Sequence, residues 1–331
     1  MMKQLIEGFS MQIREALAIG RNAAIHAGKD EIKQVVVAGM GGSGIGADFV
    51  AAFTGAECKV PFLVVKEYVL PAFVGKGTVL IASSYSGNTE ETLAACRQGM
   101  ESGARIIAVT SGGKLAEWAQ QYGWDQVLLP KGQPAPRACL GYSLVAQLSV
   151  LEKLGLIGPQ VLKEVEGSAD FLESLQDEFH EKAAQIAGFL QGKIPVLYST
   201  NVLEPVIVRF RQQLAENAKM LSWHHVVPEM NHNELVGWRR DQPGLAALFF
   251  RHPGESAANE LRMNITRDVV SEFAASRLDL HAKGKNLVEQ TLYFVHLVDW
   301  ISWYLAEMQG LDAMEIRIID FLKEKMATAK Q

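Results

Sequence analysis

Short apolar runs that alternate with amphipathic stretches constrain the fold of this chain more than any other feature. The runs are rich in β-branched residues and apolar throughout, which is typical of strands buried on both faces of a parallel sheet. They occupy residues 34–39, 61–68, 78–85, 105–112 and 126–132. Helical stretches separate or follow them, at 91–102, 115–123 and about 138–154. This alternation predicts βαβ units wound around one sheet.

A second, shorter series of the same kind follows a charged helical segment at 155–192. Its predicted elements are strands at 194–200, 244–252 and 268–275, a helix at 205–221, and C-terminal helices at about 285–309 and 315–327. At about 150 residues per domain, a chain of 331 residues accommodates two domains. We therefore predict an α/β protein with a first domain over 1–157 and a second domain, including the C-terminal helices, over 158–331.

The composition narrows the class of protein. A net charge of −5 and a pI of about 5.9 argue against a nucleic-acid partner, which requires a basic surface. Three cysteines without a CxxC motif are typical of free thiols in a reducing compartment. The N-terminal helix is amphipathic, with Phe9, Ile13 and Leu17 on its apolar face, and Glu7 and Arg14 distinguish it from a signal peptide. We expect a cytoplasmic protein with neither a membrane nor a nucleic-acid partner.

A glycine-rich loop follows the first predicted strand and opens the next helix. Gly39, Gly41 and Gly44 satisfy the pattern G-x-G-x-x-G, which is typical of dinucleotide-binding turns. Glu67 stands where such a fold places its ribose-binding acid, so an NAD-dependent oxidoreductase is one interpretation. The same turn suits any phosphate, because backbone N–H groups approach an anion at a helix N-terminus. Ser43 adds a hydroxyl donor to this loop.

A cluster of hydroxyl groups follows the third predicted strand. Ser84, Ser86 and Thr89 crowd the strand-to-helix turn. Asn88 is the expected N-cap of the next helix, with Glu91 three residues later as in a capping box. Such residues can be turn and cap residues only, but hydroxyls and N–H groups at a helix N-terminus also form a neutral cradle for a phosphate monoester. A dinucleotide fold has no need of a second anion site, so the two loops together favour a phosphate ester.

The pair GMGGSG and SYSGNTEET resembles the sugar isomerase (SIS) domain, whose serine-rich loop holds the phosphate of a phosphosugar. Two such domains in tandem, with QPAPRACLGYSL after the first and AENAK and PEMNHNE in the second, resemble the bifunctional phosphoglucose/phosphomannose isomerases over about 33–325. The resemblance implies two tandem SIS domains, each an αβα sandwich around a mainly parallel sheet. It implies that five residues bind the substrate phosphate: Gly42, Ser43, Ser84, Ser86 and Thr89.

The resemblance also implies an aldose–ketose isomerase that interconverts fructose 6-phosphate with glucose 6-phosphate and mannose 6-phosphate through a cis-enediol(ate). Glu216, in AENAK, corresponds to the family's base, which moves a proton between C1 and C2. Without the motif, Glu216 fits a solvated helix face, because Arg209, Gln213 and Lys219 continue a polar stripe. Arg137, in QPAPRACLGY, corresponds to the arginine that stabilises the enediolate charge.

Opening of the sugar ring requires an acid–base group near the ring oxygen. His232, in PEMNHNE, corresponds to the family histidine, which reaches the active site from the partner subunit and therefore implies a homodimer. Lys323 corresponds to a lysine on the last helix that assists ring opening, and Lys325 is its rival. Proton transfer beside a carbonyl needs neither a metal nor an organic cofactor, so we expect none.

Two further interpretations stand beside the NAD-dependent oxidoreductase. A cluster of histidines and acids could bind zinc, although it lacks the H-x₃-H and HExxH spacings. Its members are His224, His225, Glu229, His232 and Glu234. A non-catalytic phosphosugar sensor is the other interpretation, but we expect no DNA-binding domain with this charge. The presence of Glu216, Arg137 and His232 favours an enzyme over a sensor.

Overall fold

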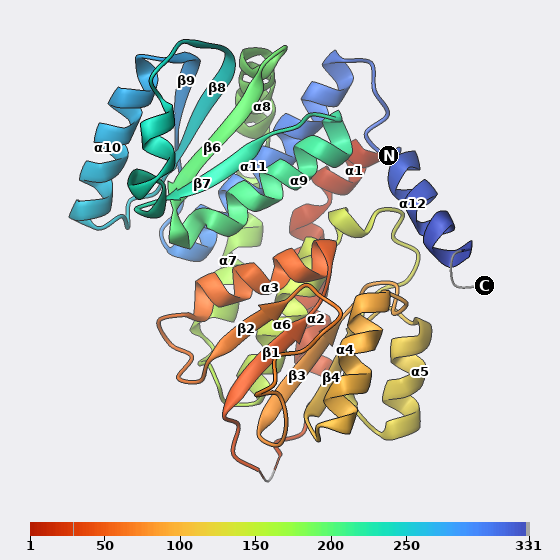
Figure 1. Cartoon of the computed structure of the whole chain (residues 1–331). Coiled ribbons are helices and arrows are strands. Elements are labelled where there is room, and N and C mark those ends of the chain that lie inside the picture. Colours follow the sequence, from red (N-terminus) through yellow and green to blue (C-terminus); the bar gives the residue numbers. More distant parts are fainter. Residues whose placement is uncertain (29, 329–331) are drawn as a thin grey trace. The chain divides into compact units, whose positions relative to one another are not determined.

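The chain forms two compact units in a computed structural model that describes residues 1–28 and 30–328 (Figure 1). The N-terminal unit comprises Glu7–Leu175 and Lys283–Tyr293, and the C-terminal unit comprises Met1–Ile6, Gln176–Ala282 and the described part of Phe294–Gln331. Each unit is therefore assembled from segments that are distant in sequence. The domain boundary near residue 157 stays a prediction. None of the described helices is long and apolar enough to cross a membrane.

A five-stranded parallel sheet forms the centre of the N-terminal unit, with strand order β2-β1-β3-β4-β5. Its strands are β1 (Gln34–Ala38), β2 (Phe62–Val65), β3 (Thr78–Ser83), β4 (Arg105–Thr110) and β5 (Asp125–Leu128). Val36 in β1 pairs with Leu63 on one side and Leu80 on the other. Each of the five apolar runs predicted as strands between residues 34 and 132 overlaps one of these elements, so the predicted parallel sheet is confirmed.

Helices cover both faces of this sheet and complete an αβα sandwich. They are α2 (Phe9–Asn22), α3 (Gly41–Thr54), α4 (Glu90–Glu101), α5 (Gly113–Tyr122), α6 (Leu140–Lys153) and α7 (Gln160–Glu173). Cys96 of α4 and Leu115 of α5 pack with Val36 and Leu80 in one buried apolar cluster. α6 packs against both α2 and α3, and α7 packs against α2. The helices on both faces thus bury the continuous apolar runs of the central strands.

A four-stranded parallel sheet forms the centre of the C-terminal unit, with strand order β7-β6-β8-β9. Its strands are β6 (Ile194–Thr200), β7 (Trp223–Val227), β8 (Gln242–Arg251) and β9 (Ala274–His281). Its helices are α1 (Met2–Glu7), α8 (Gln176–Leu190), α9 (Glu204–Ala218), α10 (Ala257–Ser271) and α12 (Arg317–Thr328), and α11 (Leu287–Met308) belongs partly to each unit. Tyr198, Phe249 and Met263 share its buried apolar cluster.

The prediction of a strand at 268–275 is wrong. α10 continues to Ser271, and the strand follows it at Ala274–His281. Met263 and Val270 are both buried, seven positions apart on one face of α10, which is a helical spacing. The two adjacent valines inside this helix, Val269 and Val270, resemble part of a strand in sequence. An apolar run this short does not show whether its apolar positions recur with the period of a strand or of a helix.

The edge strands and the N-terminal helix also differ from expectation. The sequence pattern predicts no strand at β7 (Trp223–Val227), and it places β9 at 268–275 instead of Ala274–His281. Both are edge strands, where polar residues such as His224 and Arg277 interrupt the apolar run. The predicted N-terminal helix is two helices, α1 and α2, separated at Gly8. Continuous apolar runs therefore revealed all five strands of the N-terminal sheet, including its edge strands β2 and β5, but not the two edge strands of the C-terminal sheet.

Candidate functional site

The sheet of the N-terminal unit has its topological switch point between β1 and β3. From β1 the chain crosses to β2 on one side, whereas from β3 it continues to β4 on the other. In open parallel sheets, ligands bind in the crevice outside the carboxyl ends of such a pair of strands. The glycine loop (39–44) follows β1 and the hydroxyl loop (84–89) follows β3. The two motifs therefore meet at the crevice where a ligand is expected.

Close backbone packing explains the glycines of the glycine loop. A Cβ atom on Gly39 would lie 3.0 Å from the carbonyl oxygen of Ser83, and one on Gly44 would lie 2.6 Å from the carbonyl oxygen of Gly39. Gly41, the first residue of α3, has a φ of +50° in the left-handed region, which favours glycine. Ser43 is buried in the first turn of α3. The N-terminus of α3 is thus brought beside the end of β3.

The hydroxyl loop holds its three predicted phosphate ligands in different states. Ser84 is buried, and its Oγ lies 2.8 Å from Oγ1 of Thr89. The N–H of Gly87 donates to the same Oγ at 3.1 Å. Ser86 is exposed, and its Oγ accepts a hydrogen bond from the N–H of Asn88 at 3.2 Å. A part-buried hydroxyl pair and one exposed hydroxyl therefore lie at the start of α4.

The N-cap of α4 is Thr89, so the prediction of Asn88 for that position is wrong. The side chain of Asn88 is used elsewhere. Its Oδ1 accepts a hydrogen bond from the N–H of Lys114 at 3.0 Å, and its Nδ2 donates to the carbonyl of Ser86 at 3.2 Å. Asn88 therefore joins the hydroxyl loop to the start of α5. This leaves Thr89 with Ser84 at the helix N-terminus, where an anion is stabilised.

Arg137 lies close to the glycine loop. It belongs to the 3₁₀-helix η1 (Pro136–Ala138) and is only 7% exposed. A Cβ atom on Gly42 would lie 2.8 Å from the carbonyl oxygen of Pro136 and 3.7 Å from the Cα of Arg137. The absence of a side chain at Gly42 thus lets η1 approach the first turn of α3. The structure therefore brings Arg137 and the predicted phosphate-binding residues together in one unit.

Glu216 lies in the last turn of α9, in the C-terminal unit, and is half-buried. Its carbonyl oxygen accepts a hydrogen bond from Nζ of Lys219 at 2.6 Å. The same Nζ donates to the carbonyl oxygens of Asp312 at 3.2 Å and Glu315 at 2.7 Å. Lys219 therefore fixes the segment that leads into α12 beside the end of α9 that carries Glu216.

The interpretation of the α9 stripe as a solvated face is wrong. Arg209 and Gln213 are each 2% exposed. Arg209 donates to both carboxylate oxygens of Asp299 in α11, at 3.0 and 2.6 Å, and Gln213 donates to Oδ1 of Asp299 at 2.9 Å. One turn further along, Nδ2 of Asn217 donates to Oγ of Ser302 at 2.9 Å. The polar side chains on either side of Glu216 are thus held by α11 rather than by water.

His232 ends the 3₁₀-helix η3 (Glu229–His232) and is exposed. The residues that follow it are anchored to the sheet. The Tyr198 hydroxyl, at the centre of β6, donates to the carboxylate of Glu234, and the indole N–H of Trp238 donates to the Tyr198 oxygen at 3.0 Å. Burial, followed by the nearby Glu234 charge, raises the pKa of Tyr198, so its hydroxyl stays protonated as a donor. The loop that carries His232 therefore has a fixed attachment.

Glu216 and His232 lie at opposite ends of the strands of the same sheet. Because β6 and β7 are parallel, α9 must return the chain from the carboxyl end of β6 to the amino end of β7. Glu216 stands near the end of α9 and hence near the amino ends of the strands. His232 follows the carboxyl end of β7. Within one chain, therefore, the two residues are not brought together.

The two candidate lysines of α12 are similar in their surroundings. Lys323 is 69% exposed, and its Nζ lies 3.8 Å from a carboxylate oxygen of Asp320. Nζ of Lys325 lies 5.6 Å from the centre of the Phe321 ring. Both residues are on an exposed helix in the C-terminal unit. The local geometry gives no preference between them.

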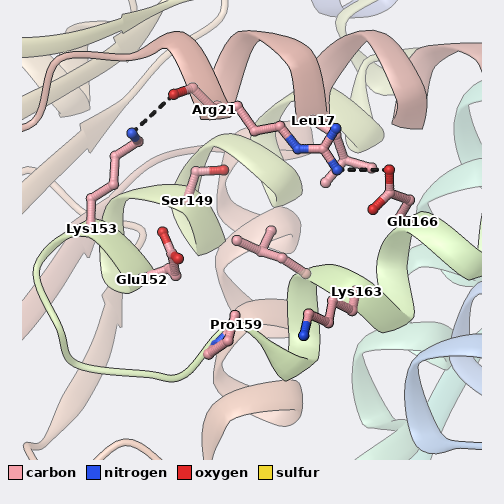
Figure 2. Close-up of a pocket in the computed structure, with 10 residues that line it drawn as sticks. Leu17, Arg21, Ser149, Glu152, Lys153, Pro159, Lys163 and Glu166 are labelled. Atoms are coloured by element: carbon pink, nitrogen blue, oxygen red, sulfur yellow. Dashed lines mark hydrogen bonds and ion pairs between the residues drawn. The ribbon is translucent and has the colours of Figure 1, made fainter.

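A cavity of about 380 Å³ in the N-terminal unit contains none of the predicted site residues (Figure 2). It lies between the ends of α2, α6 and α7. Nη2 of Arg21 lies 2.7 Å from Oε1 of Glu166, and Nζ of Lys153 donates to the carbonyl oxygen of Arg21 at 3.1 Å (Figure 2). Its charged lining is thus partly engaged in joining the three helices. We assign it no part in the chemistry.

The histidine and acid cluster noted in the sequence is dispersed. Nε2 of His224 lies 3.8 Å from Glu204, and Nδ1 of His225 accepts a hydrogen bond from the N–H of Val226 at 2.8 Å. Over residues 1–28 and 30–328, no three histidine, cysteine, aspartate or glutamate side chains are grouped as metal ligands.

Glu67, the candidate ribose-binding acid of a dinucleotide fold, uses its carboxylate locally and accepts a hydrogen bond from the N–H of Tyr68 at 2.6 Å.

Known proteins resemble this chain along most of its length. A family profile described as "Bacterial phospho-glucose isomerase C-terminal SIS domain" matches residues 179–326. A bifunctional phosphoglucose/phosphomannose isomerase of Caldicellulosiruptor bescii is 37% identical over 329 residues, covering 96% of this chain and 97% of that protein. Its counterpart from Aquifex aeolicus is 34% identical and covers 89% and 90%. A D-glucosamine-6-phosphate 4-epimerase of Sulfolobus acidocaldarius is 28% identical and covers 88% and 89%.

Solved structures share the fold at low sequence identity. The C-terminal domain of a glucosamine-fructose-6-phosphate aminotransferase from Francisella tularensis has a TM-score of 0.75 at 13% identity, covering 94% of this chain and 97% of that one. A glucosamine-6-phosphate deaminase from Thermotoga maritima has a TM-score of 0.64 at 14% identity, covering 93% and 96%. At these identities the likeness concerns the fold alone. The predicted α/β class with mainly parallel sheets is thereby confirmed.

Proposed function

The chain belongs to the family of bifunctional phosphoglucose/phosphomannose isomerases, and from that premise we propose that it interconverts fructose 6-phosphate with glucose 6-phosphate and mannose 6-phosphate. The observation that carries the proposal is the arrangement after β1 and β3 in the N-terminal unit, where the glycine loop lies against the end of β3, before the hydroxyl loop, and against the segment with Arg137. This arrangement offers a phosphate-sized anion two helix N-termini, several hydroxyls and a buried guanidinium. The alternatives of a phosphosugar sensor and an NAD-dependent oxidoreductase are not favoured.

The substrate phosphate binds to the glycine loop and the hydroxyl loop. Its ligands are Gly42, Ser43, Ser84, Ser86 and Thr89. The pairing of the Ser84 and Thr89 hydroxyls at the start of α4 supports this assignment, because both oxygens can turn their hydrogens toward an anion. Phosphate binding fixes one end of the open-chain sugar, and this positions C1 and C2 for proton transfer.

Glu216 removes the proton from one carbon and returns it to the other. The electrons of the broken C–H bond form the enediolate, whose negative oxygen is stabilised by Arg137. A half-buried carboxylate on a helix held by the buried Arg209–Asp299 pair is suited to a fixed geometry. Once C2 is planar, protonation on one face gives glucose 6-phosphate and on the other face mannose 6-phosphate.

His232 opens the sugar ring, and Lys323 or its neighbour Lys325 assists. We propose a homodimer in which His232 acts in the active site of the partner subunit. Glu216 and His232 lie at opposite ends of the strands of one sheet, so a single chain does not bring them together, and this supports the proposal. The reaction moves only protons, so we propose that it needs no metal and no organic cofactor. The free cysteines support our proposal that the enzyme is cytoplasmic.

The proposal is tested by proton NMR of the purified, EDTA-treated protein with fructose 6-phosphate in D₂O. We expect both glucose 6-phosphate and mannose 6-phosphate, with deuterium at C2 in every turnover in which the proton held by Glu216 exchanges with D₂O before it is returned. Glucose 6-phosphate alone would restrict the enzyme to phosphoglucose isomerisation. A parallel sample with glucosamine 6-phosphate tests the chemistry named for the Sulfolobus relative. Reaction at C4 of that sugar without turnover of fructose 6-phosphate would overturn the proposal.

A further inference from the structure

Tyr85 lies between two predicted phosphate ligands, yet its side chain is directed at another loop. Its hydroxyl donates to the carbonyl oxygen of Pro130 at 2.6 Å. It also accepts a hydrogen bond from the N–H of Gln133 at 3.0 Å. Both partners belong to the segment 130–137 that leads to Arg137. On the basis of the proposed function, we infer that Tyr85 is a positioning residue that fixes Arg137 relative to the phosphate-binding hydroxyls.

The backbone of Tyr85 ties in a third segment. Its carbonyl oxygen accepts one hydrogen bond from the N–H of Ser111 at 2.9 Å and one from its Oγ at 2.7 Å. Ser111 follows β4, the hydroxyl loop follows β3, and the segment 130–137 follows β5. Tyr85 therefore joins the three segments that follow the neighbouring strands β3, β4 and β5. Burial raises the pKa of the Tyr85 phenol, which keeps the proton that it donates to Pro130.

The segment 130–137 depends on its hydrogen bonds to Tyr85, because its prolines and glycine do not favour a regular helix or strand. Pro130, Pro134 and Pro136 have no N–H to donate, and Gly132 has a φ of +82°. The segment is held at its start by the Tyr85 hydroxyl and at its end by the close approach of Pro136 to the glycine loop. Loss of the first attachment releases the start of the segment that leads to Arg137.

The position of Arg137 matters most when charge develops. The enediolate exists only near the transition state, so a displaced guanidinium lowers kcat more than it raises KM. Phosphate binding rests on the hydroxyl loop and the glycine loop, which Tyr85→Phe leaves intact. A displacement of about 1 Å can reduce a rate about 100-fold. For Tyr85→Phe we expect kcat to fall about 10- to 100-fold with KM changed less than about twofold.

The experiment compares Tyr85→Phe with Tyr122→Phe, a matched change at an exposed tyrosine of the same unit. Kinetics with fructose 6-phosphate give kcat and KM, and calorimetric titration with inorganic phosphate measures the phosphate site alone. A hydroxamate analogue of the planar enediolate should lose affinity by the same factor as kcat/KM. In an Arg137→Met background, Tyr85→Phe should have little further effect, because the group that it positions is gone.

Several results would overturn the inference. If the wild type turns over and Tyr85→Phe matches Tyr122→Phe in kcat, Tyr85 positions nothing that matters. If phosphate affinity falls together with kcat, the hydroxyl loop itself has collapsed and the role is merely structural. Full additivity with Arg137→Met would show that Tyr85 acts through another group. A wild type that isomerises no phosphosugar would instead defeat the proposed function, and this inference with it.

Discussion

The two sheets of this protein share one pattern of strand order, but different residues follow the strands at their switch points. In the N-terminal unit, β1 and β3 lead into the glycine loop and the hydroxyl loop. In the C-terminal unit, β6 and β8 hold the corresponding places, with β7 and β9 outside them. β8 ends at Arg251, whose guanidinium donates to Glu255 at 2.9 and 2.7 Å, and both side chains are nearly buried. An ion pair thus follows β8 where hydroxyls follow β3.

The difference shows that a switch point supplies a crevice, while the residues at the strand ends decide whether it takes an anion. Arg251 also donates to Oδ1 of Asn264 at 2.9 Å, so its donors are used within the protein. The buried carboxylate of Glu255 repels a phosphate. We therefore expect substrate affinity to depend on the N-terminal unit. We expect the C-terminal unit to contribute the base that transfers the proton.

The largest expected effect separates proton transfer from phosphate binding. Replacing Glu216 with glutamine removes the base and leaves the hydroxyl loop intact. We expect kcat to fall about 10²- to 10⁴-fold, the usual contribution of a general base. The affinity for inorganic phosphate should stay unchanged. Coupled assays and calorimetry measure the two quantities, with Glu181→Gln on the exposed face of α8 as the control. Normal turnover in Glu216→Gln would end the assignment of the base.

The ion pair after β8 predicts the next largest effect. Glu255→Ala leaves Arg251 nearly buried without its carboxylate, which costs about 3 kcal/mol of unfolding free energy. The double variant Arg251→Met with Glu255→Leu should recover much of this loss, since no charge is left unpaired. KM should stay unchanged in both. Urea denaturation measures the stability, and a raised KM at normal stability would show that this crevice also binds substrate.

The corresponding change in the N-terminal unit should act on binding. Ser84→Ala removes the buried hydroxyl of the Ser84–Thr89 pair. A hydrogen bond to a charged group is worth about 1.5 to 3 kcal/mol, so we expect KM to rise at least about 10-fold. Thr200→Val, at the end of β6, is the matched control and should leave KM unaltered. Steady-state kinetics decide, and equal KM values for both variants would contradict the contrast between the units.

The smallest expected effect concerns acid stability. His296 in the C-terminal unit is fully buried, and burial lowers its pKa to about 3. Because an unfolded histidine has a pKa of about 6.5, the unfolded chain takes up the proton first, and stability falls as pH drops from about 6.5 toward 3. We expect a loss of about 1 to 2 kcal/mol between pH 7 and pH 5 from this group.

Hydrogen exchange at the two pH values locates this loss. The sole histidine of the N-terminal unit within the described chain is His26, which is exposed and lies 2.5 Å from Asp125. Acid should therefore loosen β6 and β8 before β1 and β3. His296→Asn should flatten the pH dependence, whereas His281→Asn, at an exposed histidine, should not. Equal acid sensitivity of wild type and His296→Asn would refute the assignment.

The predictions from sequence succeeded where one strong local pattern was enough. The central strands are apolar throughout, and the glycine and hydroxyl loops follow directly after two of them. The prediction failed for β7 and β9, the edge strands of the C-terminal sheet, because their sequences mix polar with apolar residues. Tyr85 was overlooked as well. Its position inside the hydroxyl loop was visible, but the signal that mattered was its partner Pro130, 45 positions away.

What the sequence determined by itself is the α/β class, the glycine loop and the hydroxyl loop as motifs, and the family, since each of these rests on motifs of residues close together along the chain. Only the tertiary structure decided which polar residues are buried. Arg209 and Gln213 look solvated when their helix is considered alone, but the carboxylate that binds both is Asp299 of α11, which lies 90 and 86 positions later in the chain. Periodicity describes one element at a time, whereas burial of a polar group depends on the partner that another element brings to it.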